Sequence, residues 1–179
     1  MEEESLKTPT ESTESIREGT LAIDLGNSTT IVVFQGERDK EPELLTPFPL
    51  CKSAGEIPSL VWHSITDAPY LLIGEEVNQS NIFKQDDNNL SSDFKRWIGS
   101  KEISASYKSN LSPEKAGELL IQKVWDKVTS KFKIKRLVLT APVETYRAYR
   151  KWLLTVCRSL DVNEIALVDE PTAAAMGAG

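Results

Sequence analysis

Two short runs of strand-forming residues, with a tight turn between them, constrain most strongly how this chain can fold. Leu21-Ala22-Ile23 is apolar, and residues 29–34 are dense in β-branched side chains. The segment between them, Asp24-Leu25-Gly26-Asn27-Ser28, contains Gly and Asn, which are common turn formers. The pattern predicts two strands joined by a hairpin with a carboxylate at its entrance.

Helices and strands alternate in the second half of the chain. Ser112-Pro113-Glu114 is typical of a helix start, because Ser caps, Pro fits the first turn and Glu favours the positive end. Apolar residues at helical spacing extend this helix to Phe132. Further strands are expected at residues 59–62, 70–73, 137–139 and 165–168, and further helices at 144–160 and from 172. This order predicts an α/β fold with a mixed sheet.

The length of 179 residues suits one domain or two small subdomains that share a core. Residues 1–19 are rich in Glu, Ser and Thr and are expected to be a disordered acidic tail. We predict a core formed by residues 20–55 and 133–179. An inserted subdomain is expected at about 56–111, with a connecting helix at about 112–132.

Charge and hydropathy exclude several classes of partner. The formal net charge of -6 argues against nucleic acid, but not against ATP, since phosphate sites are often built from backbone amides. No apolar run is long enough to span a membrane, and the acidic start is unlike a secretory signal. We therefore expect a cytoplasmic protein in which Cys51 and Cys157 are reduced structural thiols.

The segment that follows the first strand has features of a phosphate loop. Gly26 allows the backbone to approach a ligand closely, and successive amides from Asn27 to Thr29 can form a concave nest for phosphate oxygens. Asp24 could hold a hydrated Mg²⁺ or orient water. An ordinary polar β-turn is the alternative interpretation of this segment alone.

A second polar segment follows the last expected strand. Val168-Asp169-Glu170-Pro171-Thr172 places two carboxylates at a strand end, where open α/β sheets bind ligands, and an Ala-rich helix follows. The alternative is a capped helix start with two solvated acids.

Taken together and in this order, several segments resemble the DnaK-type seventy-kilodalton heat-shock chaperones. The resemblance runs from about residue 20 to residue 179. The segments that carry it are Ala22-Ile23-Asp24-Leu25-Gly26, Ile57-Pro58-Ser59-Leu60-Val61, Phe94-Lys95-Arg96-Trp97-Ile98-Gly99, Leu137-Val138-Leu139-Thr140-Ala141-Pro142 and Glu170-Pro171-Thr172-Ala173-Ala174-Ala175. The chain departs from the family at Asn27-Ser28, where Thr-Thr is usual, and after Pro142.

The resemblance implies an actin-like ATPase (ribonuclease-H-like) fold, of which this chain holds the first subdomain pair, incomplete. It implies ATP or ADP and Mg²⁺ as cofactors. Asp24 matches the aspartate that organises metal and water. The stretch that faces the phosphates in the family matches Gly26, Asn27, Ser28 and Thr29.

Four later residues also match functional residues of that family. Lys95 matches the catalytic lysine that reaches the γ-phosphate, and Glu170 matches a glutamate near the metal and its waters. Pro142 and Arg150 match a pair that relays the nucleotide state toward the substrate domain. Judged without the resemblance, Lys95 and Arg150 would be ordinary surface cations.

The function implied is the ATP-binding portion of a molecular chaperone that couples ATP hydrolysis to polypeptide binding. The family's second phosphate loop and second lobe lie beyond residue 179, so turnover by this chain alone is not expected. Clients and co-chaperones belong to the full-length protein, and the uncovered face around the last helix, with Val168, Ala174, Ala175 and Met176, allows self-association.

Two other functions remain open. One is a small-molecule kinase of the same superfold, and the other is a non-catalytic interaction module derived from the chaperone lobe. His63, which has no second candidate ligand in the sequence pattern, is interpreted as structural.

Overall fold

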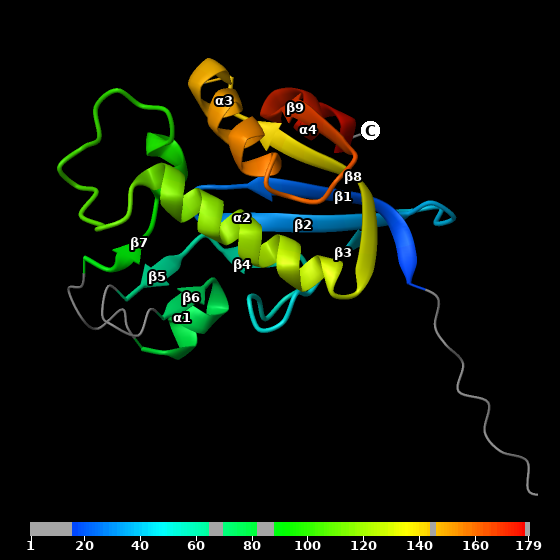
Figure 1. The fold of residues 1–179 in the computed structure, drawn as a ribbon, viewed down its shortest axis with the longest axis horizontal. Coiled ribbons are helices and arrows are strands. Elements are labelled where there is room, and N and C mark those ends of the chain that lie inside the picture. Colours follow the sequence, from blue (N-terminus) through cyan, green and yellow to red (C-terminus); the bar gives the residue numbers. More distant parts are fainter. Residues whose placement is uncertain (1–15, 65–69, 82–87, 144–145, 178–179) are drawn as a thin grey trace, which may run out of the picture.

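The computed structural model describes residues 16–64, 70–81, 88–143 and 146–177 (Figure 1). It is a mixed α/β structure with one six-stranded sheet and one three-stranded sheet, which confirms the α/β class. The large sheet has the order β3-β2-β1-β8-β9, and β4 also pairs with β2. Its strands are β1 (Arg17–Leu25), β2 (Thr29–Gly36), β3 (Glu43–Leu44), β4 (Glu56–Pro58), β8 (Phe132–Ala141) and β9 (Glu164–Asp169).

The predicted hairpin is the antiparallel pair β1–β2, in register from Gly19 opposite Gly36 to Leu25 opposite Thr30. Side chains alternate across it, so that Leu21, Ile23 and Leu25 are buried while Asp24 is exposed. The strand begins at Arg17, three residues before the expected start of order, because Arg17, Glu18 and Gly19 pair with the first residues of β8. Residues 1–15 of the predicted tail lie outside the described residues.

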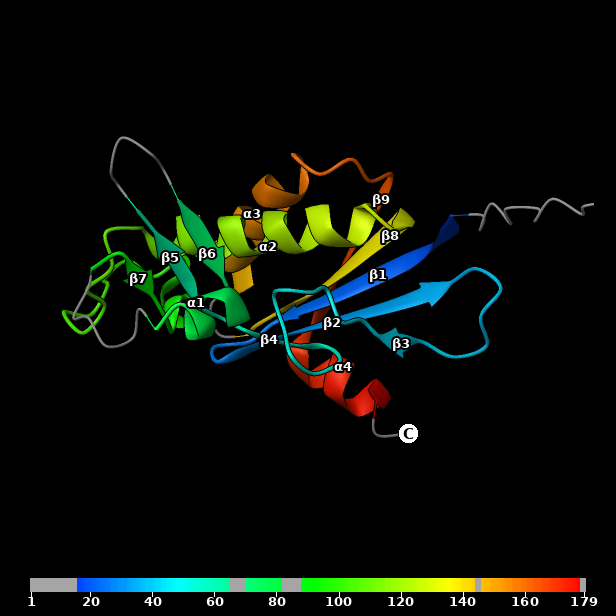
Figure 2. The same ribbon diagram turned by 90° about the horizontal axis from the view of Figure 1, so that it is seen from below.

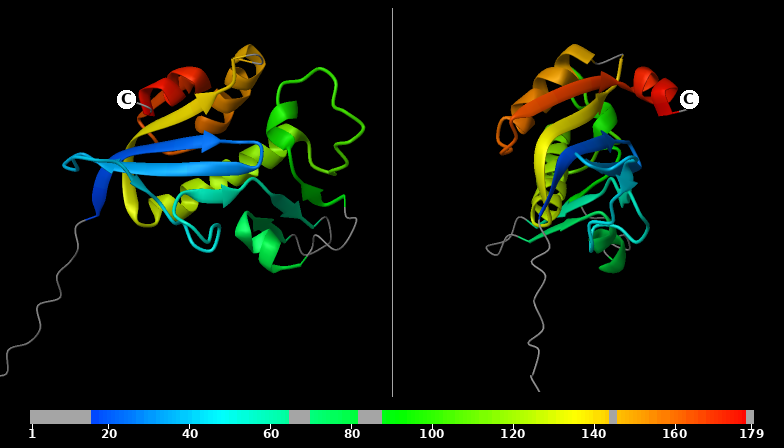
Figure 3. Two further views of the ribbon diagram at one scale, coloured as in Figure 1. Left: turned by 180° about the vertical axis from the view of Figure 1, so that it is seen from behind. Right: turned by 90° about the vertical axis from the view of Figure 1, so that its right-hand side faces the viewer.

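The strands β8 and β9 lie parallel to β1, and all three end at the same edge of the sheet. The orange, yellow and blue strands in the right panel of Figure 3 follow one another in this order. The register places Ile23 beside Leu139 and Ala141 beside Asp169. The polar segments after β1 and in β9 are therefore brought to one edge, as their positions at strand ends predicted.

Helices cover both faces of the large sheet. The helices α2 (Pro113–Thr129) and α3 (Tyr146–Cys157) lie on one face, and α4 (Glu170–Gly177) lies on the other (Figure 2). The Ser112 hydroxyl caps α2 by accepting from the Lys115 amide at 3.1 Å, as predicted. The helix ends at Thr129, before the expected Phe132, because Phe132 is already in β8 and stacks 4.4 Å from Phe34.

The smaller sheet lies within the predicted insertion. Its strands are β5 (Val61–His63), β6 (Leu71–Ile73) and β7 (Leu90–Ser91), in the order β6-β5-β7, with α1 (Glu75–Gln79) beside them. The strand expected at 59–62 is displaced, because β4 belongs to the larger sheet and ends at Pro58, and β5 begins only at Val61. Residues 78–93, where the sequence predicts no strand or helix, contain β7 and the end of α1 in their described part.

The two cysteines behave as the sequence analysis expects. Cys51 and Cys157 are both free and buried. Burial raises the pKa of the Cys157 thiol to about 11, so this thiol stays protonated at neutral pH. Within the described ranges, no helix has both the length and the apolar character needed to cross a bilayer.

Candidate functional site

The turn between β1 and β2 is built around Gly26. Its amide donates to the carbonyl of Thr29 at 3.1 Å, and a Cβ at this position would lie 2.2 Å from that same oxygen. Only glycine fits a turn closed this tightly. The hydroxyl of Ser59 donates to the Gly26 carbonyl at 2.8 Å, and the Ser59 amide donates to the Ser28 carbonyl at 2.9 Å. The turn is therefore fixed from the neighbouring segment as well as from within.

The carbonyls of Gly26, Ser28 and Thr29 have partners, but two amides of this turn do not. Among the described residues, no acceptor lies within hydrogen-bond distance of the Asn27 or Ser28 amide. Both residues, with Thr29, are exposed at the tip. Adjacent unpaired amides on a fixed turn can receive an anionic oxygen, so the geometry is compatible with the predicted phosphate nest.

Asp24 is held at the same edge by the neighbouring parallel strand. The hydroxyl of Thr140 in β8 donates to Asp24 Oδ1 at 2.5 Å. The other carboxylate oxygen has no partner among the described residues, and the side chain is exposed. One oxygen is thus oriented by the protein while the second is available to a metal-bound water or a ligand.

Lys95 and Glu170 meet at this edge although they are 75 residues apart. Lys95 Nζ lies 2.5 Å from Glu170 Oε1. The lysine side chain is only 10% exposed, whereas the glutamate is 38% exposed. A lysine with so little exposure is not an ordinary surface cation, and it is found buried in proteins mainly when it is paired.

The position of Lys95 follows from its local structure. It lies in the short 3-10 helix η2 (Phe94–Trp97), which is anchored by the buried side chains of Phe94 and Ile98. The helix ends at Trp97, and Gly99, two residues later, has a positive φ of 76° and donates its amide to Glu114 Oε1 at 2.9 Å. These anchors on either side direct Lys95 toward the edge of the large sheet.

The two acids at the end of β9 have different roles. Asp169 Oδ1 accepts from the Thr172 amide at 2.9 Å and so caps α4, and the hydroxyl and amide of Thr172 lower the pKa of this carboxyl. Glu170 instead turns to Lys95. The alternative of a capped helix start is therefore correct for Asp169, but Glu170 is not simply a solvated acid.

Tyr149, which lies in the helix predicted at 144–160, is a residue of this region that the sequence analysis did not single out. Its side chain is fully buried, and its hydroxyl has no hydrogen-bond partner among the described residues. Burial raises the pKa of the phenol, and the negative charges of Glu170 and Asp24 raise it further. The apolar spacing of α3 gave no indication that this hydroxyl is buried without a partner among the described residues.

The structure brings most of the predicted site residues to one edge, and it shows no hydrogen bond or ion pair between Pro142 and Arg150, which are both described. Pro142 is half-buried just after β8. Arg150 is exposed on α3 and forms no ion pair with a described residue. The intervening residues 144 and 145 lie outside the described residues. The relay role of Pro142 and Arg150 stays a prediction.

The residues at this edge suit Mg²⁺ better than a metal that needs a protein cage. No group of three or more His, Cys, Asp or Glu side chains within the described ranges could hold an ion. Mg²⁺ usually keeps several waters and takes one or two carboxylates together with substrate phosphates. Asp24 and Glu170 fit that pattern, with the unpaired amides of Asn27 and Ser28 on the same edge.

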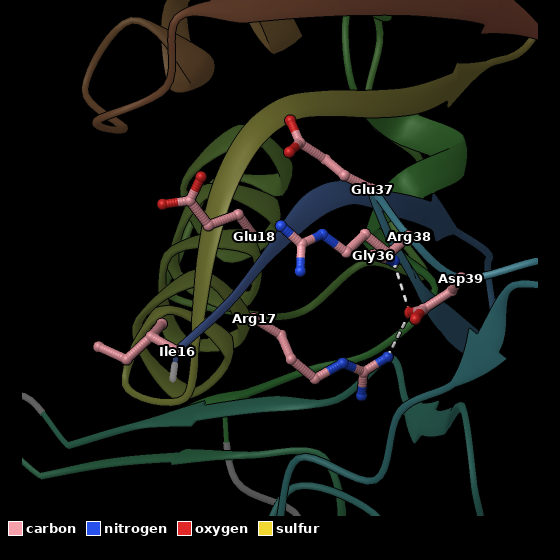
Figure 4. Close-up of a pocket in the computed structure, with 7 residues that line it drawn as sticks. All are labelled: Ile16, Arg17, Glu18, Gly36, Glu37, Arg38 and Asp39. Carbon is pink, nitrogen blue, oxygen red and sulfur yellow. Dashed lines mark hydrogen bonds and ion pairs between the residues drawn. The ribbon is translucent and has the colours of Figure 1, made fainter. Parts of the chain in front are cut away.

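Hollows at the opposite edge of the sheet have a different character. One of about 290 Å³ is lined by Ile16, Arg17, Glu18, Gly36, Glu37, Arg38 and Asp39 (Figure 4). The guanidinium of Arg17 is bound by Asp39 and Glu43, and the Gly36 amide donates to Asp39. Its polar groups are largely occupied by one another, so this hollow offers little to a ligand.

Comparison with known proteins adds no relative. No protein-family model matches the chain, and no curated protein sequence matches it significantly. The assignment of a function therefore depends on the motifs and on the geometry of the edge formed by Asp24, the 26–29 turn, Lys95 and Glu170.

Proposed function

We propose that this chain is the first part of the nucleotide-binding lobe of an actin-like ATPase of the DnaK chaperone type. The described residues would bind the phosphates and Mg²⁺ of ATP at the edge where β1, β8 and β9 end. Handling of unfolded polypeptides would belong to the full-length protein, as in the family that the sequence resembles.

The observation that supports this most strongly is the Lys95–Glu170 ion pair. These two residues were selected by resemblance from segments that are distant in the sequence, and they lie 2.5 Å apart. Exposed lysines and glutamates pair elsewhere in the molecule, but the lysine of this pair is only 10% exposed. Their contact beside Asp24 gives one cation and two carboxylates at the carboxyl edge of the parallel strands, where α/β sheets bind ligands.

Each group has a role that phosphoryl chemistry requires. The Asn27 and Ser28 amides would receive phosphate oxygens, and Lys95 would supply positive charge where negative charge accumulates. Asp24 and Glu170 would hold the water shell of Mg²⁺. When bound, the ion neutralises phosphate charge, and the chain's own contribution is positioning.

Titration of the 179-residue chain with Mg·ATP tests the proposal, with tryptophan fluorescence as the readout, since Trp97 adjoins Lys95. The described residues provide one phosphate loop, so we expect saturable binding with a Kd of about 1 mM, or about -4 kcal/mol. Lys95→Met should weaken it about tenfold, because a charge-assisted contact is lost. The matched control is Lys101→Met, at an exposed lysine, which should change nothing.

Adenosine, which lacks phosphates, should not produce the signal. If neither ATP nor ADP saturates at about 10 mM, a concentration that detects affinities well below the expected one, the phosphate site is wrong. The interaction-module alternative would then be favoured. Binding that is unaffected by Lys95→Met would return Lys95 to a structural role.

A further inference from the structure

A groove at the carboxyl end of α2 combines apolar side chains with lysines. It has a volume of about 260 Å³ and lies between that end of the helix and the segment that follows β3. Pro47, Phe48 and Phe132 give the groove apolar surface. Lys127 and Lys131 give it positive charge, and its lining contains no acidic side chain. Because the Phe48 ring is 74% exposed, the groove presents open apolar surface, which is typical of an interaction site.

The two lysines of the groove have no carboxylate to pair with. Neither Lys127 nor Lys131 forms an ion pair with a described residue, whereas Lys133 and Lys135, at the start of β8, both lie 2.7 Å from Glu18. The last turn of α2 favours the positive charge of Lys127, but Lys131 lies beyond the helix. The groove is therefore a cationic and apolar surface on a chain of net charge -6, and it suits an acidic segment with an apolar side chain.

The first described residues of the chain lie beside this groove. In the parallel pair β1–β8, Arg17 is opposite Phe132, and its guanidinium lies 5.6 Å from the centre of the Phe132 ring. Figure 1 shows the start of β1 next to the turn that joins α2 to β8. The chain thus enters the sheet at Ile16, close to Lys131 and to the groove.

The sequence before Ile16 contains the chemistry that this groove suits. Residues 1–15 include five Glu and one Lys, and Glu2-Glu3-Glu4 is closely followed by Leu6, which is the only branched aliphatic residue among them. One such side chain cannot form a core, so Leu6 can be buried only against another surface. The chain from Leu6 to Ile16 can extend to about 33 Å, which is ample for a groove next to Ile16.

We propose that the segment Glu2–Leu6 docks in this groove of its own chain. Leu6 packs against the exposed ring of Phe48, and the three glutamates face Lys127 and Lys131. The covalent tether raises the effective concentration of the segment to about the millimolar range, so weak contacts are sufficient. The inference goes beyond the proposed function, because the groove lies away from the edge where β1 ends and its occupation needs no nucleotide.

Zero-length carbodiimide cross-linking of the full chain tests the docking, because the reagent joins a carboxylate to an amine only when the two are in contact. Mass spectrometry of the digested monomer should find Glu2, Glu3 or Glu4 joined to Lys127 or Lys131. Leu6→Ser keeps every charge but removes the apolar contact, so it should lower the yield of these cross-links about fivefold. The cross-link expected between Glu18 and Lys133, an ion pair of 2.7 Å, is the internal reference and should not change.

A change in the groove itself should have the same effect. Phe48→Ala removes an exposed ring, so Tm should stay within about 3 °C, while the yield of the cross-links to Lys127 and Lys131 should fall about threefold. The matched control is Tyr70→Ala, at another exposed aromatic residue that precedes β6 and does not line the groove. It should leave the yield of these cross-links unchanged.

Three results would overturn the proposal. Equal cross-linking of the glutamates to Lys101, an exposed lysine in the segment before α2, would mean that the acidic segment has no preferred site. Cross-links to the groove lysines that survive both Leu6→Ser and Phe48→Ala would mean that the apolar surface does not hold the segment. Cross-links confined to a dimeric fraction would place the segment on a second copy of the chain. Each measurement is made without nucleotide, so its outcome is independent of the titration with Mg·ATP.

Discussion

The two edges of the large sheet are built from similar kinds of charged residues, yet they differ in how those residues are paired. At the edge where β1 begins, Glu18 contacts both Lys133 and Lys135 at 2.7 Å, and Arg17 is bound by Asp39 and Glu43. At the edge where β1 ends, two amides and the Tyr149 hydroxyl have no partner among the described residues.

The comparison shows that charge density by itself does not indicate a site. The edge where β1 begins, here called the amino edge, has more ion pairs, and the hollow of about 290 Å³ lies there. Its charged groups are exposed and form ion pairs with one another. The edge where β1 ends, here called the carboxyl edge, has fewer charged groups, and one of them is a lysine side chain that is only 10% exposed. Some hydrogen-bond donors at this edge have no acceptor among the described residues. Polar groups that folding leaves unpaired are the ones a ligand can satisfy.

The largest expected difference between the two edges concerns their glycines. A Cβ at Gly26 would lie 2.2 Å from a backbone oxygen, whereas a Cβ at Gly36 would lie 2.4 Å from the carboxylate of Asp39, which can move aside. Gly26→Ala should therefore cost about 2 kcal/mol of unfolding free energy, as overpacking against a rigid neighbour does. Gly36→Ala should cost clearly less. Urea denaturation measures both, and equal costs would mean that the 26–29 turn is not rigid.

Removal of one carboxylate at each edge should give the next largest difference. Glu170→Gln leaves the nearly buried Lys95 without its counter-charge, and we expect a loss of about 1–2 kcal/mol, reduced from a fully buried pair by the partial exposure of Glu170. Glu18→Gln removes exposed ion pairs and should have a small effect. Thermal unfolding at neutral pH compares the two variants. A greater loss from Glu18→Gln would reverse the distinction between the edges.

The smallest expected effect is the pH dependence of the stability that the ion pairs of Glu18 contribute at the amino edge. Lys133 and then Lys135 lower the pKa of Glu18 from 4.5 to about 2. A lowered pKa means that Glu18 stabilises the folded state above pH 4.5, and that this contribution is lost as the pH falls toward 2. The difference in stability between the wild type and Glu18→Gln should shrink over this range and also with added salt.

The control for this measurement is Glu41→Gln, at an exposed glutamate that forms no ion pair with a described residue. Its effect on stability should be small, because no ion pair is lost. A difference for Glu18→Gln that persisted unchanged down to pH 2 would show that the pairing with Lys133 and Lys135 does not stabilise the folded chain.

Local signals in the sequence predicted much of the fold. The β-branched run and the turn at Gly26 predicted the β1–β2 hairpin, and Ser112 followed by Pro113 predicted the start of α2. These predictions succeed because strand propensity, turn formation and capping depend on a few adjacent residues. Element ends were less predictable, since the end of α2 depends on Phe132 packing against Phe34 from a distant strand.

The sequence by itself determined which residues could form a phosphate site, because the types and order of Asp24, the 26–29 turn, Lys95 and Glu170 were visible there. Only the tertiary structure decided that Lys95 meets Glu170, that Thr140 holds Asp24 and that the Tyr149 hydroxyl is buried without a partner among the described residues. These contacts depend on the register of β1, β8 and β9 and on the anchoring of η2 and α3. Such long-range packing has no local signature, so a tyrosine in an amphipathic helix looks the same in the sequence whether its hydroxyl reaches solvent or is buried without a partner.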